Sequence, residues 1–197
     1  MPRERAIDYE QKTSLIKDAA AIHFATTGYP AAKLADIAKS CGVSKSMLYH
    51  YFPSKDDLLF SMIEEHLDAI LDELQFVAHQ KHTAVIEFRC FLQTLLMQST
   101  SSRQRNIVAM SEAKYLPTKL LKRIKQKELK VLILIQKCLG KLNPNLDESL
   151  YKPYALMLTG IINWTDTWFD DNGVLTREEL VHHVSDLFLH GFLSKKT

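Results

Sequence analysis

Apolar residues recur every three or four positions along almost the whole chain. Ile16, Ala20 and Phe24 form one such stripe, and Ile63, Leu67 and Ile70 begin another. This spacing is typical of helices with one buried face, and no useful stretch alternates between apolar and polar residues as a half-buried strand does. Six glycines and six prolines are also few for a protein of many strands and turns. We therefore expect an all-α protein of about nine helices.

Composition places the chain among ordinary globular proteins and excludes collagenous or largely disordered classes. Hydrophobic residues make up 46%, charged residues 24%, and the net charge is only +2. The three cysteines are widely spaced and form no CxxC pattern, so neither a disulfide framework nor a metal site is expected. The first residues lack the apolar run of a signal peptide, and no apolar stretch has membrane-spanning length. These features predict a cytoplasmic protein.

The most informative pattern lies in residues 34–55. Two short helices are predicted there, joined by a turn that contains Gly42, which is the sequence form of a helix-turn-helix. Leu34, Ile37 and Leu48 supply an apolar inner face, which leaves hydroxyl, basic and aromatic residues on the outer side of the second helix. Side chains near the start of such a helix can reach base edges in the major groove. Many helical hairpins share this spacing, so spacing alone leaves DNA binding open.

Three runs in this region closely resemble the tetracycline-repressor (TetR) family: ADIA at 35–38, CGVS at 41–44 and LYHYFPSKDDLL at 48–59. Phe24 and Gly28 fit the same pattern, and the resemblance covers roughly residues 9–60. It implies an N-terminal helix-turn-helix DNA-binding domain at 1–56. It also implies a helical ligand-binding and dimerisation domain at 57–197.

The resemblance assigns roles to individual residues. Lys45, Ser46 and Met47 are expected at base edges. Tyr49 and His50 are expected to contact the sugar-phosphate backbone or thymine methyl groups, and Tyr51 and Lys55 to anchor phosphates. Lys33 stands where family members often carry Ser or Thr, so that a charge replaces a capping hydroxyl. The full set of expected DNA-binding residues is Lys33, Ser44, Lys45, Ser46, Met47, Tyr49, His50, Tyr51 and Lys55.

The implied function is a ligand-responsive transcriptional regulator, most often a repressor, that binds a palindromic operator as a homodimer. A finer resemblance is to members that regulate fatty-acid, aromatic-acid or steroid breakdown, several of which respond to acyl-coenzyme A thioesters. It lies in residues 163–164, 168–169 and 187–191 and in the turn at Gly173. The expected partners are therefore double-stranded DNA, a second copy of the chain and a small apolar effector, with no cofactor, metal or membrane.

Two further residue sets follow for the C-terminal part, and ordinary intrachain core is the alternative for both. The effector pocket is expected to involve Phe88, Phe91, Leu95, Met110, Leu121, Met157, Asn163 and Trp164. The dimer interface is expected to involve Ile161, Trp168, Leu180, Val184, Leu187 and Phe188. Residues 119–130 include a basic run that suits the phosphates of a coenzyme A, or is simply a solvated helix face.

Two other classes of protein compete with this interpretation. An enzyme is not expected, because the chain has no GxSxG, HExxH, Walker or GxGxxG motif. A helical interaction module that has lost DNA binding is disfavoured by the intact run at 49–55. Salt-dependent DNA binding separates a regulator from both.

Overall fold

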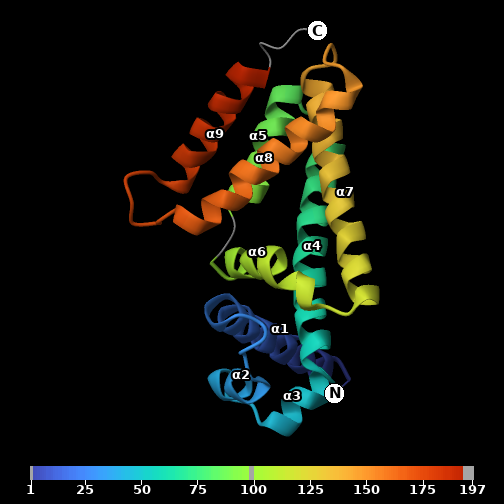
Figure 1. Cartoon of the computed structure of the whole chain (residues 1–197), viewed down its shortest axis with the longest axis vertical. Helices are drawn as coiled ribbons and strands as arrows, with labels where there is room; N and C mark the ends of the chain where they lie inside the picture. The colour runs from blue at the N-terminus through green and yellow to red at the C-terminus, as the bar shows by residue number, and fades with distance from the viewer. Residues whose placement is uncertain (1, 98–99, 193–197) are drawn as a thin grey trace. The chain divides into compact units, whose positions relative to one another are not determined.

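Helices make up nearly all of the computed structural model, which describes residues 2–97 and 100–192. Those residues form nine α-helices and one 3-10 turn and contain no strand, so the predicted all-α class is confirmed (Figure 1). The elements are α1 (Pro2–Thr27), α2 (Leu34–Ser40), α3 (Lys45–Tyr51), α4 (Lys55–His79), α5 (Ala84–Leu96), α6 (Thr100–Glu112), η1 (Ala113–Tyr115), α7 (Thr118–Leu142), α8 (Glu148–Trp168) and α9 (Arg177–Phe192).

The chain packs as two compact units. The first unit contains residues up to 66 together with 100–125, and the second contains 67–99 and the residues from 126 onward. The boundaries fall inside α4 and α7, so each of these helices contributes to both units. These packing units differ from the functional division expected at residue 56, which stays a prediction.

The first unit is built around α1, which contacts both α2 and α6. Ile16, Ala20 and Phe24 are fully buried along one stripe of α1, as their spacing predicts. The helix stops at Gly28, whose φ of 75° is left-handed and whose N–H donates to the Phe24 carbonyl at 3.1 Å. Glycine adopts this conformation without the steric cost of a Cβ, which is why it ends the helix here.

The predicted helix-turn-helix follows α1 in the chain and is present in the structure. α2 and α3 pack against each other, and the turn between them passes through Gly42 at a φ of 68°. Leu34, Ile37 and Leu48 are buried between the two helices and the rest of the unit. The apolar inner face and the glycine reversal therefore both form as the local sequence predicts.

Ion pairs tie α1, α4 and α6 together in the first unit. The Arg105 guanidinium donates to Asp18 at 2.9 Å and to Glu65 at 2.7 Å, and the buried Lys17 ammonium also donates to Glu65. Burial alone would raise the pKa of Glu65, but the hydrogen bonds from Lys17 and Arg105 outweigh it and lower that pKa. A charge buried in this way is stable only when it is paired.

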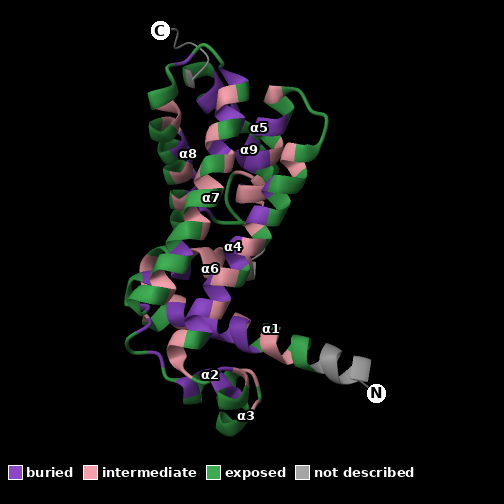
Figure 2. Cartoon of the chain, turned by 90° about the vertical axis from the view of Figure 1, so that its right-hand side faces the viewer, coloured by how far each residue is buried: buried purple, intermediate pink, exposed green. Residues whose placement is uncertain are grey.

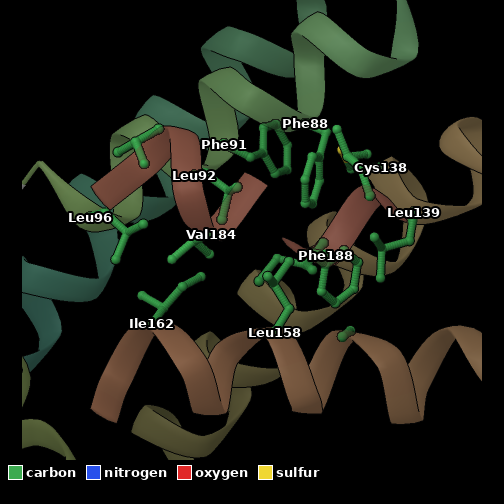
Figure 3. Packing of buried hydrophobic residues seen from close by; sticks show 14 of the residues in the cluster. Phe88, Phe91, Leu92, Leu96, Cys138, Leu139, Leu158, Ile162, Val184 and Phe188 are labelled. Carbon is green, nitrogen blue, oxygen red and sulfur yellow. The ribbon is translucent and has the colours of Figure 1, made fainter. Parts of the chain in front are cut away.

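The second unit encloses an apolar core to which α5, α8 and α9 contribute together with parts of α4 and α7. Phe88 stacks on Phe188 with ring centroids 5.4 Å apart, and Leu92, Leu158 and Val184 pack around them (Figure 3). At the margin of this core the buried Glu87 carboxylate accepts two hydrogen bonds from Lys141, both at 2.8 Å. This packing uses one stripe of each helix and leaves the opposite stripes of α8 and α9 exposed.

Candidate nucleic-acid interface

The outer face of α3 is open to solvent, while its inner face is core. Leu48 and Phe52 are 0% and 5% exposed, whereas Met47 and Tyr49 are 37% and 43% exposed. Figure 2 shows exposed residues, in green, on α3. The other exposed residues of this segment are Ser44, Lys45, Ser46 and His50. The Lys45 ammonium lies 5.8 Å from the centre of the Tyr49 ring, one helical turn further on. The exposed face of α3 therefore carries hydroxyl groups, a cation and aromatic rings.

Ser44 forms the start of this helix. Its backbone is extended, with φ −71° and ψ 152°, and its hydroxyl oxygen accepts a hydrogen bond from the Met47 N–H at 3.1 Å. This is the geometry of an N-cap, which satisfies one of the unpaired N–H groups at a helix start. The Ser46 hydroxyl lies 3.1 Å from that of Ser44, and both residues are exposed, as is Lys45 between them.

Beside α3 the surface forms a hollow of about 550 Å³, which we call the α2–α3 hollow. It is lined by Ala32, Lys33, Leu34, Ala35, Lys45, Tyr49, Pro53, Ser54 and Lys55. Three lysines from different elements converge on it, and none of the lining residues is acidic. A positively charged concavity of this kind suits the phosphates of a polyanion.

Lys55 has a different environment from the one expected for a phosphate anchor. Its ammonium group donates to the carbonyl oxygens of Tyr29, Pro30 and Ala32, at 2.8, 3.3 and 3.1 Å, and lies 4.4 Å from the centre of the Tyr29 ring. Three N–H donors thus have three carbonyl acceptors within the protein. Lys55 thus holds the turn before α2, and contacts between its donors and DNA would compete with these bonds. Its expected phosphate contact stays a prediction.

Tyr51 is half-buried, unlike the residues before it in α3. Its ring lies 4.8 Å from that of Tyr9 in α1 and meets the edge of the His50 ring at 5.7 Å. Tyr9 is 49% exposed and belongs to the same aromatic group, although no local signal in the sequence points to it. The contact joins residues 42 positions apart and depends on how α1 packs.

Lys33 is exposed at the N-cap of α2 and makes no side-chain capping hydrogen bond. The departure noted in the sequence therefore has a structural counterpart, since α2 begins without a capping hydroxyl. The Lys33 side chain is instead available on the rim of the α2–α3 hollow.

The residues expected to line an effector pocket do not gather within either packing unit. Phe88 and Phe91 are 1% and 3% exposed in the core of the second unit, and Leu95 packs partly buried against them. Met157 and Trp164 are exposed on α8, at 55% and 69%. Met110, which is exposed, and the half-buried Leu121 belong to the first unit, whereas the half-buried Asn163 belongs to the second. Phe88 and Phe91 thus belong to the packed core, and the expected effector pocket stays a prediction.

The residues expected at a dimer interface divide into two groups. Leu180, Val184 and Phe188 are buried in the core of their own chain and have little exposed area, so their expected place at a dimer interface stays a prediction. Ile161, Trp168 and Leu187 are exposed, at 37%, 53% and 73%. Ile161 and Trp168 belong to a solvent-exposed apolar row on α8, which we call the α8 stripe and which is made of Met157, Ile161, Trp164 and Trp168.

Other kinds of site receive no support from the described residues. Among residues 2–97 and 100–192, no cluster of three or more His, Cys, Asp or Glu side chains is arranged to hold a metal ion. No helix in these same ranges combines the length and apolarity that crossing a membrane requires.

Comparison with known proteins identifies both parts of the chain. Residues 16–62 match the family profile described as "Bacterial regulatory proteins, tetR family", and residues 81–192 match "Tetracyclin repressor-like, C-terminal domain". The HTH-type transcriptional regulator YuxN of Bacillus subtilis is 42% identical over 59 residues, which are 30% of this chain and only 20% of that relative.

Solved structures extend the similarity over almost the whole chain. A TetR-family transcriptional regulator from Bordetella parapertussis has a TM-score of 0.87 and 29% identity, covering 95% of this chain and 99% of its own. AibR, solved in complex with isovaleryl coenzyme A and operator DNA, has a TM-score of 0.75 and 21% identity, covering 92% and 98%. At that identity the second likeness concerns the fold alone.

Proposed function

The chain belongs to the tetR family of bacterial regulatory proteins, and on that premise we propose that it is a transcriptional regulator whose α3 enters the major groove of DNA. The observation that carries the proposal is the exposed face of α3 beside the lysine-lined α2–α3 hollow. Such a surface places groups that distinguish bases next to groups that neutralise phosphates.

Each exposed residue has a proposed role. Lys45, Ser46 and Met47 lie in the first turn of α3 and contact base edges, because the start of a recognition helix is the part that lies deepest in the groove. Tyr49 and His50 contact the sugar-phosphate backbone or thymine methyl groups. Lys33 neutralises a phosphate from the rim of the α2–α3 hollow, and the Tyr51 hydroxyl contacts a phosphate. Lys55 acts indirectly, by holding the turn that precedes α2.

We propose that two copies act together on a palindromic operator. A twofold dimer presents two recognition helices to half-sites about 34–36 Å apart or a multiple of that spacing. The α8 stripe and Leu187 support a second copy as partner, since large exposed apolar side chains are costly on an isolated soluble chain. The regulator is proposed to repress, with DNA binding relieved by an effector.

The proposed effector is an acyl-coenzyme A or another apolar metabolite. It acts by binding the conformation with low DNA affinity more tightly than the other, because a ligand shifts an equilibrium only through such a difference. The fold that the chain shares with AibR supports this ligand class. Thermal unfolding with isovaleryl coenzyme A, a long-chain acyl-coenzyme A and coenzyme A alone tests it. Stabilisation by an acyl form but not by coenzyme A alone is expected, and no shift with any of them contradicts this ligand class.

DNA binding is tested by selecting duplexes from a random-sequence library with the purified protein. We expect a selected palindrome whose affinity falls steeply between about 50 and 200 mM salt, because phosphate contacts release counterions. Lys45→Met and Ser46→Ala should change which bases are selected. Lys119→Met, which removes an exposed lysine of α7, is the matched control and should leave the selected sequence unchanged. Failure to enrich any sequence, or an unchanged preference in both α3 variants, contradicts the proposal.

A further inference from the structure

The turn between α1 and α2, residues 28–33, is held by contacts from two different helices. We propose that Glu112, at the end of α6, is a positioning residue for DNA binding. By accepting a hydrogen bond from the Tyr29 backbone N–H, Glu112 fixes the position of the helix-turn-helix. The proposal rests on the proposed function in that it takes DNA binding as its readout. It adds a named connection between α6 and the DNA-contacting helices.

The first step is the backbone hydrogen bonding of this turn. After Gly28 ends α1 the chain runs Tyr29-Pro30, and the Ala32 N–H returns to the Gly28 carbonyl at 3.1 Å. The Tyr29 N–H donates instead to the Glu112 carboxylate, at 2.7 Å and across 83 positions of sequence. Because Tyr29 is only 8% exposed, its N–H would have little access to water if Glu112 moved away. Leaving such a donor unpaired is costly, and a bond to a carboxylate is stronger than a neutral one.

The second step is the set of contacts between Tyr29 and α4. The Tyr29 hydroxyl donates to the Asp56 carboxylate, and the Tyr29 carbonyl accepts from Lys55. Burial, and then the bond and charge of Asp56, raise the pKa of Tyr29, so the phenol stays protonated and continues to donate. The side chain and carbonyl of Tyr29 are thus fixed to α4, while its N–H is fixed to α6.

The third step is the connection to the DNA-contacting surface. The Tyr115 ring of η1 stacks on Tyr29, with centroids 5.7 Å apart and planes 20° apart, so the segment after Glu112 reinforces the same contact. From Tyr29 the chain reaches Lys33 and α2, and α2 packs on α3. A shift of the end of α6 therefore moves or releases the turn, and with it the start of α2 and the rim of the α2–α3 hollow.

The bond from the Tyr29 N–H to Glu112 therefore bears on how firmly the helix-turn-helix is placed. With Glu112 on Tyr29 the turn is held at both sides, and α2 and α3 keep the spacing seen here. Without Glu112 the Tyr29 N–H loses its acceptor, while the contacts to α4 and the ring contact with Phe24 of α1 remain, so the helix-turn-helix is less well fixed. A regulator whose effector moves α6 would lose DNA affinity through this bond, because the bond stabilises only one of the two states.

The test compares Glu112→Ala with Glu112→Gln. Both remove the same charge, but glutamine keeps an oxygen that can accept from the Tyr29 N–H. With a duplex selected by the wild-type protein, we expect the alanine variant to bind about tenfold more weakly, and the glutamine variant to stay within about threefold of wild type. Glu73→Ala, which removes an exposed acid of α4, controls for the general effect of charge on DNA affinity.

Hydrogen exchange separates positioning from a general loss of stability. In the alanine variant, faster exchange should be confined to peptides covering residues 28–33, with the 16–24 segment of α1 unchanged and the unfolding temperature nearly preserved. Equal binding by the alanine and glutamine variants overturns the proposal, as does faster exchange throughout α1 and α6. If the wild-type protein selects no duplex, the proposed function fails; if it does and Glu112→Ala binds equally well, only this inference fails.

Discussion

Among single residues, His66 stands out because it is buried and one of its ring nitrogens lacks a hydrogen-bond partner among the described residues. It is 4% exposed on α4, and its Nε2 has no hydrogen-bond partner within the described part of the chain. Burial lowers the pKa of His66 to about 4, and the positive charge of Arg105 acts in the same direction, while a hydrogen bond with Asn106 opposes them. The imidazole is therefore neutral in the folded protein at neutral pH.

This burial predicts a pH dependence of stability. Because the unfolded histidine titrates near 6.5, the unfolded state binds the proton more tightly, and stability falls as pH drops from about 6.5 towards 4. Relative to His66→Phe, the wild-type free energy of unfolding should drop by about 2 kcal/mol between pH 7 and pH 5. Urea unfolding of both proteins at the two pH values measures this. A constant difference between them would show that His66 does not resist protonation.

At the scale of elements, the short helices of the DNA-contacting region depend on their caps. Seven-residue helices have little intrinsic stability, since nucleation costs several ordered residues for each hydrogen bond gained. α3 has the Ser44 cap, while α2 begins at Lys33 without one and is held by the contacts of Lys55 to the preceding turn. The two helices of the motif are therefore fixed in different ways: α3 by its own cap, and α2 by the contacts of α4 with the preceding turn.

The cap of α3 can be separated from its contact with DNA. Ser44→Ala should lower the free energy of unfolding by about 1 kcal/mol, because an N–H at the start of α3 loses its acceptor. Ser44→Asp keeps an acceptor and should retain stability, yet weaken DNA binding because its carboxylate faces the phosphates. Urea unfolding and DNA titration measure the two effects.

The control for this pair is the equivalent cap of α5. Thr83→Ala removes a side chain that accepts from the Ile86 N–H, and it should cost stability without a direct effect on DNA. If the Ser44→Asp variant binds DNA as tightly as the wild-type protein, Ser44 lies away from the phosphates.

For the whole molecule, the exposed apolar side chains of α8 and α9 bear on its assembly. Trp164 is 69% exposed and Leu187 is 73% exposed, although the opposite stripes of the same helices are core. Stable interfaces bury about 800 Å² on each partner and are built around large apolar or aromatic residues. A second copy of the chain that packs on the α8 stripe and Leu187 would therefore bury large exposed apolar side chains.

We expect Trp164→Lys and Leu187→Lys to convert a dimer into monomers at micromolar concentration. Neither substitution should unfold the chain, because surface changes away from caps and cores usually alter stability by less than about 0.5 kcal/mol. Sedimentation equilibrium measures the mass, and Phe76→Lys, at a comparably exposed site on α4, is the matched control. A monomeric wild-type protein, or dimers in both variants, would refute this placement of the interface.

The features that could be predicted from the order of residues are local ones. The helical class, the Gly28 and Gly42 reversals and the Ser44 cap follow from interactions between residues at most four positions apart, and such interactions depend little on the rest of the molecule.

Packing of the whole chain settles which side of each helix faces inward and which distant groups meet. Leu180 and Leu187 lie on one helix with the same side chain, yet one is core and the other is exposed. Lys55 finds carbonyls 23 to 26 positions earlier, and Glu112 finds an amide 83 positions earlier. Periodicity shows that a helix has an apolar face, but the partner of that face depends on how all the helices pack, because burial and long-range hydrogen bonds are properties of the assembled chain.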